Sequence, residues 1–170
     1  YMSIFPVIWL FGLPCSGKTT LAHELKQSFE DSANESVILD GDDMRKRFSP
    51  DLGFTMADRF THIKRTVAYA GKCQIDNKHV IVSLITPLEL HREYIKQVLP
   101  SVCLIFLDCP VDVCENRDVK GHYKEARMQR LLSFTGVSHP FEAPGIVDLT
   151  LHTNRQSIEG CRAAICEVLC

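Results

Sequence analysis

Gly12-Leu-Pro-Cys-Ser-Gly-Lys-Thr19 is the stretch that decides the fold of this chain, because it matches the pattern G-x-x-x-x-G-K-[ST] along its whole length. The apolar run Val7–Phe11 comes directly before it, and a helical pattern begins at Lys18. In this order of strand, loop and helix, the glycines let backbone N–H groups turn inward, and the start of the helix adds its positive dipole end. The stretch therefore predicts a loop that binds phosphate groups.

Two side chains of this P-loop have predicted chemical roles. We expect Lys18 to reach the β- and γ-phosphates of ATP, and the Thr19 hydroxyl to bind Mg²⁺. Cys15 could carry a thiol of lowered pKa, but we favour a small side chain that faces away from the phosphates, since reactivity also needs exposure. ATP and Mg²⁺ are thus the predicted cofactors. The predicted nucleotide-binding residues are Gly12, Leu13, Pro14, Cys15, Ser16, Gly17, Lys18, Thr19 and Thr20.

Further apolar runs alternate with helix-length amphipathic segments along the chain. Nearly continuous apolar runs are typical of parallel strands that helices cover on both faces. We therefore predict an α/β fold, the three-layer α/β/α P-loop kinase fold with a five-stranded parallel sheet. The predicted strands are Val7–Phe11, Val37–Leu39, Val80–Leu84, Val102–Leu107 and Ile146–Leu151. The predicted helices are Lys18–Phe29, Thr55–Asn77, Leu88–Leu99, Val111–Asn116 and Gln156–Leu169.

The segment between the last two predicted strands has a different composition. It is charged and poor in apolar residues at first, and then contains several Gly and Pro residues. A charged insertion between two core strands is a candidate lid over an active site. We place this lid at about residues 117–144, within a single domain formed by residues 1–170, because that length suits one core.

Composition and charge exclude several classes of function. The net charge of −2 and the pI near 6.4 provide no basic field of the kind that nucleic-acid-binding proteins use. No apolar run approaches the roughly twenty residues of a membrane span. The 8 cysteines include no CxxC pair. Cys103 and Cys109 lie at an apolar run, where a free cysteine packs as a small apolar side chain. We therefore predict a cytoplasmic protein that binds neither nucleic acid nor a membrane.

Carboxylates follow the second predicted strand, where the chain reads LDGDDMR. The carboxyl ends of strands are where α/β sheets bind ligands. Phosphoryl transfer to a hydroxyl needs one carboxylate near the attacking oxygen and another group that holds Mg²⁺ or its water ligands. Asp40 and Asp42 are the candidates, and one of them should cap the helix that starts near Asp43. We expect Asp42 to be the functional carboxylate, and we predict Thr19 and Asp40 as metal ligands.

Several longer motifs resemble those of the adenylyl-sulfate kinases. Besides the P-loop, these motifs are LDGD-x-x-R at residues 39–45, LGF followed by DR at residues 52–59, and SLITP at residues 83–87. The most specific motif is CENRDVKGHYKEAR followed by FTGVSHPFEAP, within residues 114–144. Because the motifs extend over nearly the whole length, the chain is identified as a member of this family.

The resemblance implies transfer of the γ-phosphate of ATP to the ribose 3′-hydroxyl of adenylyl sulfate, which gives 3′-phosphoadenylyl sulfate and ADP. It implies catalytic roles for Lys18, Asp42 and Lys120, a contact of Arg117 with the adenine of ATP, and a homodimer. Thr86 stands where the family usually has a serine proposed as a phosphorylated intermediate. In-line transfer needs no covalent step, so we assign Thr86 no nucleophilic role. The implied acceptor pocket consists of Asp42, Arg45, Phe54, Arg59, Ile85, Lys120 and Phe134.

Most residues of the implied pocket have a physical role that suits this acceptor. Phe54 and Phe134 could clamp its adenine by stacking, and Arg45 and Arg59 could hold its phosphosulfate. Lys120 could bring positive charge down with the lid. Without the resemblance, we would expect Phe134 to pack in the core and the arginines to be solvated.

Some positions depart from the family's pattern, and we expect them on the acceptor side. His62 replaces an asparagine near the acceptor; we keep it as a substrate-binding residue, because imidazole can still donate a hydrogen bond. Asp43 replaces a common asparagine, Ser133 a common glycine and Phe141 a common tyrosine. Two alternatives therefore stay open. One is a similar kinase for another nucleotide-linked acceptor, such as a cytidine diphosphate derivative, and the other is a nucleotide-binding module that regulates a partner without turnover.

Overall fold

A computed structural model describes residues 6–31, 35–118, 120–131 and 133–169 of the chain. Its centre is a parallel sheet of 5 strands in the order β2-β3-β1-β4-β5. The strands are β1 Val7–Phe11, β2 Ser36–Asp40, β3 His79–Ser83, β4 Val102–Asp108 and β5 Leu149–His152. The predicted α/β fold class and its five-stranded parallel sheet are therefore confirmed.

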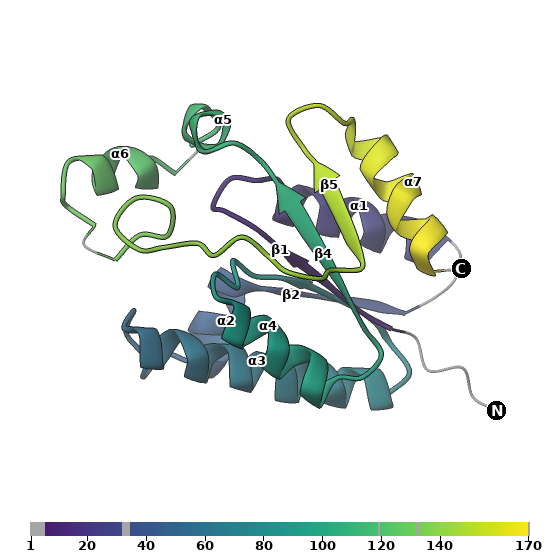
Figure 1. The fold of residues 1–170 in the computed structure, drawn as a ribbon. Coiled ribbons are helices and arrows are strands. Elements are labelled where there is room, and N and C mark those ends of the chain that lie inside the picture. The colour runs from purple at the N-terminus through teal and green to yellow at the C-terminus, as the bar shows by residue number, and fades with distance from the viewer. Residues whose placement is uncertain (1–5, 32–34, 119, 132, 170) are drawn as a thin grey trace.

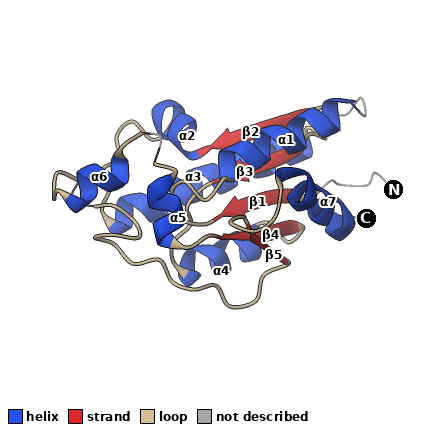
Figure 2. Ribbon diagram, turned by 90° about the horizontal axis from the view of Figure 1, so that it is seen from above, coloured by secondary structure: helices blue, strands red, loops and turns tan. Residues whose placement is uncertain are grey.

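Helices cover both faces of this sheet (Figure 1, Figure 2). They are α1 Lys18–Asp31, α2 Gly41–Phe48, α3 Met56–Ile75, α4 Glu89–Val98, α5 Val111–Asn116, α6 His122–Arg127 and α7 Ile158–Leu169. α1 and α7 lie on one face, and α3 and α4 lie on the opposite face. Within the described ranges, no helix combines the length and the apolar character that crossing a membrane requires.

The central strand β1 explains why the apolar runs are continuous. Its alternate side chains point to opposite faces of the sheet. Trp9 packs with Ile63 of α3 and Ile95 of α4 in one buried cluster, while Ile8 packs with Leu25 of α1 in a second one. Because helices cover both faces, every residue of β1 is buried.

Most predicted boundaries differ from those of the structure by about one or two residues, and two differences stand out. β5 begins at Leu149 rather than at Ile146, whose residue surface is 86% exposed. The helix after β2 begins at Gly41 rather than near Asp43, because Asp40 caps it from the preceding position. The second difference brings the helix start directly to the carboxyl end of the strand.

The predicted lid contains a helix, α6, that the sequence does not predict. The N–H groups of His122 and Tyr123 donate to the Asp118 carboxylate, each at 2.9 Å. A carboxylate in this position satisfies donors that the start of a helix leaves without partners. α6 lies beyond the carboxyl ends of the strands, to the left in Figure 1, and the lid therefore lies at the edge of the sheet that carries the P-loop.

A buried arginine anchors the segment by which the chain leaves the lid. Arg92 of α4 is 1% exposed, and its guanidinium lies 5.8 Å from the centre of the Phe141 ring. It donates to the carbonyls of Thr86 and Glu142, each at 3.0 Å, and it pairs with the Glu89 carboxylate at 2.7 Å. Because these partners compensate the buried charge, Arg92 ties the loop after β3 to the root of the lid.

Candidate active site

The P-loop connects β1 to α1, and its shape requires both of its glycines. Gly12 has a φ of +153°, and a Cβ atom at this position would lie 2.6 Å from the carbonyl oxygen of Leu107. Gly17 has a φ of +100°, which residues with a side chain rarely adopt. Thr20 is exposed on the first turn of α1. The first N–H groups of α1 have no acceptor within the helix, so the loop and the helix start together offer donors to an anion.

Cysteines pack beneath the P-loop as apolar side chains. Cys15 is half-buried and packs against a cluster formed by Cys109, Cys114 and Tyr123. Burial raises the pKa of the Cys114 thiol to about 12 and that of Cys103 to about 11, so both thiols are protonated at neutral pH. The structural role that the sequence predicts for Cys103 and Cys109 agrees with their burial.

Lys18 holds its ammonium group inside the loop. The Nζ atom donates to the carbonyls of Gly12 at 3.1 Å and Leu13 at 2.6 Å, and to the Ser16 hydroxyl at 3.4 Å. Burial of the ammonium lowers the pKa of Lys18 to about 8. Phosphate oxygens are stronger partners for an ammonium than neutral carbonyls are. We therefore expect Lys18 to exchange these carbonyls for the phosphates of a nucleotide.

This lowered pKa predicts weaker capture of ATP at alkaline pH. Lys18 attracts phosphates only while it is protonated, and kcat/KM reports ionisations of the enzyme without ligand. The kcat/KM for MgATP, measured at saturating acceptor, should be level below about pH 8 and fall about tenfold per pH unit above it. A Lys18→Arg variant should lack this fall, because guanidinium stays charged. The same profile in that variant would assign the ionisation to another group.

Oxygen atoms suited to Mg²⁺ lie beside the P-loop. The Thr19 hydroxyl donates to Asp40 Oδ2 at 2.9 Å and lies 3.5 Å from the Ser83 hydroxyl. Asp40 Oδ1 accepts the N–H of Asp42 at 3.1 Å, so Asp40 is the aspartate that caps α2. In the described part of the chain, no group of three or more His, Cys, Asp or Glu could hold a metal by itself. One carboxylate and a hydroxyl fit Mg²⁺ instead, because this ion is usually shared with substrate phosphates and water.

The second aspartate of this segment, Asp42, contacts the lid. Lys120 Nζ donates to Asp42 Oδ2 at 2.5 Å, and the side chains are 63% and 62% exposed. This hydrogen bond lowers the pKa of Asp42 and raises that of Lys120, so both groups are charged at neutral pH. The structure thus brings together two of the predicted catalytic residues, one from α2 and one from the lid.

Two arginines flank an exposed aromatic ring in the predicted acceptor pocket. Phe54 is 55% exposed, and the guanidinium groups of Arg45 and Arg59 lie 4.5 Å and 6.0 Å from its ring centre. Arg59 also reaches the lid, where it donates to the Ser133 carbonyl at 2.6 Å and to the Thr135 hydroxyl at 3.0 Å. Burial lowers the pKa of both arginines. These arginines are therefore built into the site rather than fully solvated on their helices.

Phe134 and Ile85 lie close to the P-loop. The Phe134 ring packs edge-on against Tyr123 at 4.8 Å, and the Tyr123 hydroxyl donates to the Pro14 carbonyl at 3.0 Å. The Ile85 carbonyl accepts the N–H of Gly12 at 3.3 Å. Tyr123, which is not among the predicted site residues, thus links the lid to the loop.

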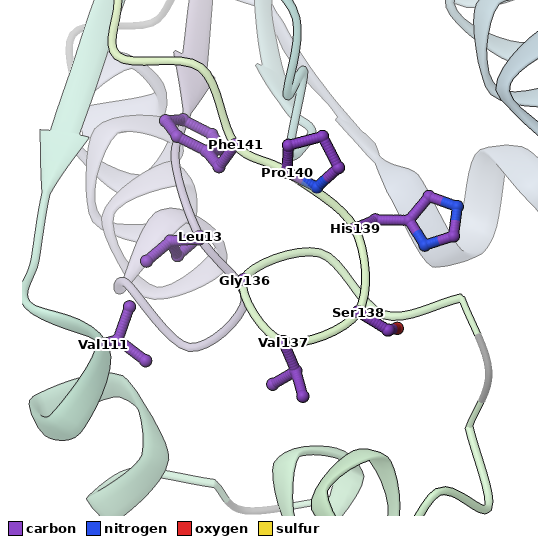
Figure 3. Close-up of a pocket in the computed structure, with 8 residues that line it drawn as sticks. All are labelled: Leu13, Val111, Gly136, Val137, Ser138, His139, Pro140 and Phe141. Atoms are coloured by element: carbon purple, nitrogen blue, oxygen red, sulfur yellow. The ribbon is translucent and has the colours of Figure 1, made fainter.

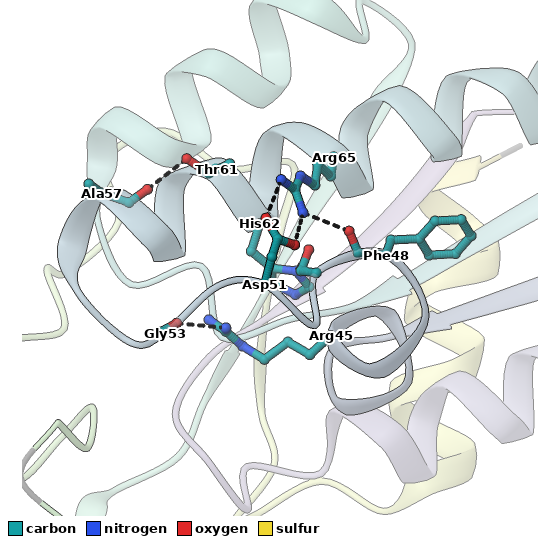
Figure 4. Close-up of polar contacts among 9 residues, drawn as sticks. Arg45, Phe48, Asp51, Gly53, Ala57, Thr61, His62 and Arg65 are labelled. Atoms are coloured by element: carbon teal, nitrogen blue, oxygen red, sulfur yellow. Dashed lines mark hydrogen bonds and ion pairs between the residues drawn. The ribbon is translucent and has the colours of Figure 1, made fainter.

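His62 is buried next to Arg45 and Arg65, and it is not exposed where it could donate a hydrogen bond to the acceptor. It is 5% exposed, its Nδ1 lies 3.0 Å from the Ser49 hydroxyl, and its Nε2 has no hydrogen-bond partner among the described residues. Arg45, which donates to the Gly53 carbonyl, and Arg65 lie on two sides of it (Figure 4). Burial and these two positive charges lower the pKa of His62 to about 4. The imidazole is therefore neutral at physiological pH.

The other departures from the family's pattern do not gather at one pocket. Asp43 is exposed and faces Lys46 at 3.9 Å. Phe141 stacks on Phe106 of β4 at 5.8 Å, as a residue of the core does. Ser133 contacts the acceptor side through its carbonyl, which any residue at this position offers. Their positions give little support to the idea that they reshape the acceptor pocket together.

An open cavity of about 440 Å³ lies between the P-loop and part of the lid (Figure 3). Leu13 lines it from the loop, Val111 from the start of α5, and residues 136–141 from the lid. The His139 Nδ1 atom is buried without a hydrogen-bond partner among the described residues. At the rim of this cavity the lid touches the loop, because a Cβ atom at Gly136 would lie 3.0 Å from Leu13 Cδ2.

Arg117 reaches the loop that follows β5. It is exposed at the end of α5, its Nη2 donates to the Thr153 carbonyl at 2.8 Å, and its Nη1 lies 3.6 Å from the Cys109 sulfur. An exposed planar guanidinium can lie against the ring of a nucleotide base. The Thr153 hydroxyl donates to the Ser16 carbonyl in the P-loop at 2.8 Å. Thr153 is not among the site residues that the sequence predicts, although its place just after a parallel strand is a signal for ligand sites.

Thr86 has its hydroxyl turned into the core. It is 1% exposed, and its Oγ1 accepts the indole N–H of Trp9 at 2.9 Å and donates to the Leu84 carbonyl at 3.5 Å. Its backbone has a φ of +46°. These contacts give the hydroxyl a structural role.

Comparisons with known proteins agree with one another. The family model for adenylylsulphate kinase matches residues 5–152. An adenylyl-sulfate kinase of Paraburkholderia xenovorans is 37% identical, over 89% of this chain and 86% of the relative. That of Deinococcus deserti is 40% identical, over 90% and 84%. A solved structure of a Mycobacterium tuberculosis APS kinase in complex with AMPPNP and APS matches with a TM-score of 0.92 at 32% identity, over 97% of both chains.

Proposed function

Because this chain belongs to the adenylylsulphate kinase family, we propose that it phosphorylates the 3′-hydroxyl of adenylyl sulfate, with MgATP as the donor. The products are 3′-phosphoadenylyl sulfate and ADP, so the reaction belongs to sulfate activation. The observation that carries the proposal is the pairing of Asp42 with Lys120 at the sheet edge that carries the P-loop. It brings an acceptor-side carboxylate and a cation of the lid to the place where phosphate is bound.

In the proposed reaction, the 3′-oxygen attacks the γ-phosphorus in line. The bond from this phosphorus to the β,γ-bridging oxygen breaks, and ADP leaves with its electron pair. Lys18 neutralises charge on the β- and γ-phosphates, and the hydroxyl proton passes to Asp42 and then to solvent. Because the transition state is loose, the proton leaves late. A carboxylate of lowered pKa such as Asp42 is therefore sufficient as its acceptor.

Mg²⁺, when bound with the nucleotide, supplies positive charge at the phosphate oxygens. Thr19 and Asp40 are the residues that would hold it, directly or through water, and they already contact each other at 2.9 Å. The anionic acceptor would lie between the core and the lid. There Arg45 and Arg59 offer planar donors beside the Phe54 ring.

Thr86 should take no covalent part in this reaction, because its hydroxyl is buried against Trp9. A Thr86→Val variant should keep kcat within about threefold, while its free energy of unfolding falls by about 1–3 kcal/mol for the lost buried hydrogen bond. ADP release and denaturant unfolding at 25 °C measure the two effects. Phosphothreonine that builds up in the wild type with ATP alone, and decays when acceptor is added, would contradict this expectation.

The acceptor is tested by measuring ADP release with purified protein and MgATP. Adenylyl sulfate is compared with a panel of nucleoside diphosphate derivatives, and with no acceptor. We expect rapid turnover with adenylyl sulfate alone. Turnover with a cytidine diphosphate derivative only would keep the mechanism and change the substrate. ATP binding without turnover on any acceptor would favour a regulatory nucleotide-binding module.

We also infer that residues 1–170 form a single kinase unit with its lid at about residues 117–144, and that the chain acts as a cytoplasmic homodimer. The family resemblance supports these proposals. Sedimentation equilibrium at micromolar protein concentration tests the dimer, and a single species with the mass of one chain, 19.2 kDa, would refute it.

A further inference from the structure

We propose that Thr153 is a positioning residue for the nucleotide, because it holds one peptide of the P-loop in the orientation that binds phosphate. The proposal rests on the proposed function only in taking ATP as the ligand of the loop. Thr153 follows β5 directly, and its N–H donates to the Asp108 carbonyl at the end of β4 at 3.1 Å. The paired ends of two strands therefore fix its backbone.

The side chain of Thr153 acts on the peptide between Ser16 and Gly17. Its hydroxyl donates to the Ser16 carbonyl at 2.8 Å. In a trans peptide the C=O and N–H groups point in opposite directions, so a carbonyl held toward Thr153 turns the N–H of Gly17 the other way. That N–H belongs to the donors of the P-loop that point at phosphate oxygens.

This peptide needs an external partner to stay in place. Gly17 has a φ of +100°, and glycine has no side chain to restrict its rotation. Ser16 is fully buried, so water does not readily replace the hydroxyl of Thr153 as a donor. Without the hydroxyl, the peptide gains the freedom to rotate, and binding of phosphate must then fix it again.

The backbone of Thr153 contacts Arg117, the residue proposed to bind the base at the other end of the nucleotide. The Thr153 carbonyl accepts the Nη2 group of Arg117 at 2.8 Å. Thr153 thus connects the phosphate loop with the residue proposed to lie against the base. A side-chain substitution leaves its carbonyl in place, so the two connections can be separated by experiment.

The test compares two variants that differ in the hydroxyl. Thr153→Val keeps the shape and removes the donor, while Thr153→Ser keeps the donor. Titration calorimetry, without acceptor, measures the Kd of ATP, ADP and inorganic pyrophosphate. We expect Thr153→Val to weaken all three by about tenfold, which is the upper part of the range for one lost hydrogen bond between neutral groups. Thr153→Ser should stay within about threefold of the wild type.

Several outcomes would overturn the proposal. One is that Thr153→Val binds the three ligands as tightly as the wild type. Another is that Thr153→Ser loses as much affinity as Thr153→Val. A third is that Thr153→Val binds ATP more weakly but pyrophosphate normally. Thr150→Val, an exposed threonine of the same strand, is the matched control and should bind all three ligands normally. Because no acceptor is present, the result is independent of adenylyl sulfate turnover. Failure to phosphorylate adenylyl sulfate would refute the proposed function and leave this inference standing.

Discussion

The Asp42→Asn variant is expected to lose kcat by about two to four orders of magnitude, the range typical of a lost general base. An amide keeps the size of the side chain but does not accept the proton of the attacking hydroxyl. The fold should be unaffected, because Asp42 is 62% exposed and its ion pair with Lys120 contributes at most about 1 kcal/mol. ADP release at saturating adenylyl sulfate measures the loss, and the Kd of ATP should change by less than about twofold.

The neighbouring carboxylate provides the control for this experiment. Asp43 lies on the same helix, is exposed and faces Lys46 at 3.9 Å. Asp43→Asn should retain nearly all of the wild-type rate. If Asp42→Asn kept more than about a tenth of the wild-type kcat, Asp42 would be at most a binding residue.

The Lys120→Ala variant should lose about a hundredfold to a thousandfold in kcat/KM for adenylyl sulfate, with little change in the Kd of ATP. Lys120 is the cation that the lid brings to the acceptor side. Removing one hydrogen-bond donor that stabilises the charge of the transition state typically has an effect of this size. The contact of Lys120 with Asp42 also links the lid to α2. Steady-state kinetics with varied acceptor, together with calorimetric titration of ATP, separates the two ligands.

A second lysine of the lid distinguishes this role from a general loss of charge. Lys124 lies in α6, which begins just after Lys120, and is exposed. Lys124→Ala removes the same charge from the lid and should leave both constants close to those of the wild type. Equal losses for acceptor and ATP in Lys120→Ala would assign Lys120 to the nucleotide rather than to the acceptor.

The sheet was predictable from the sequence because its strands are buried on both faces. β1 is fully buried, and its apolar run marks the strand. The P-loop motif that follows marks the start of the next helix. The start of β5 was not predictable in the same way. Ile146 is apolar but 86% exposed, and its carbonyl accepts Lys96 Nζ at 2.5 Å. Apolar character alone does not show whether a strand has begun.

The candidate site was predictable where its residues are close together in the sequence. Asp40 ends β2 and Asp42 comes just after it, so a capping role for one of the two could be anticipated, and the structure assigns it to Asp40. The contact of Asp42 with Lys120 spans 78 positions, and without the family resemblance nothing in either segment indicates the other. The neutral state of His62 was equally hidden, because it results from burial and from nearby arginines. Thr153 was missed because a hydroxyl gains its role only from the carbonyl opposite it.

The anchor formed by Arg92 affects how an enzyme of this shape can diverge during evolution. The Arg92 guanidinium bonds to the carbonyls of Glu142 at the root of the lid and of Thr86 in the loop after β3. If these two segments moved apart, the buried charge of Arg92 would lose its partners. Ser133 meets Arg59 through a carbonyl, which every amino acid supplies. A substitution at position 133 can therefore keep the contact with Arg59, whereas a substitution of Arg92 removes the bonds that hold the root of the lid.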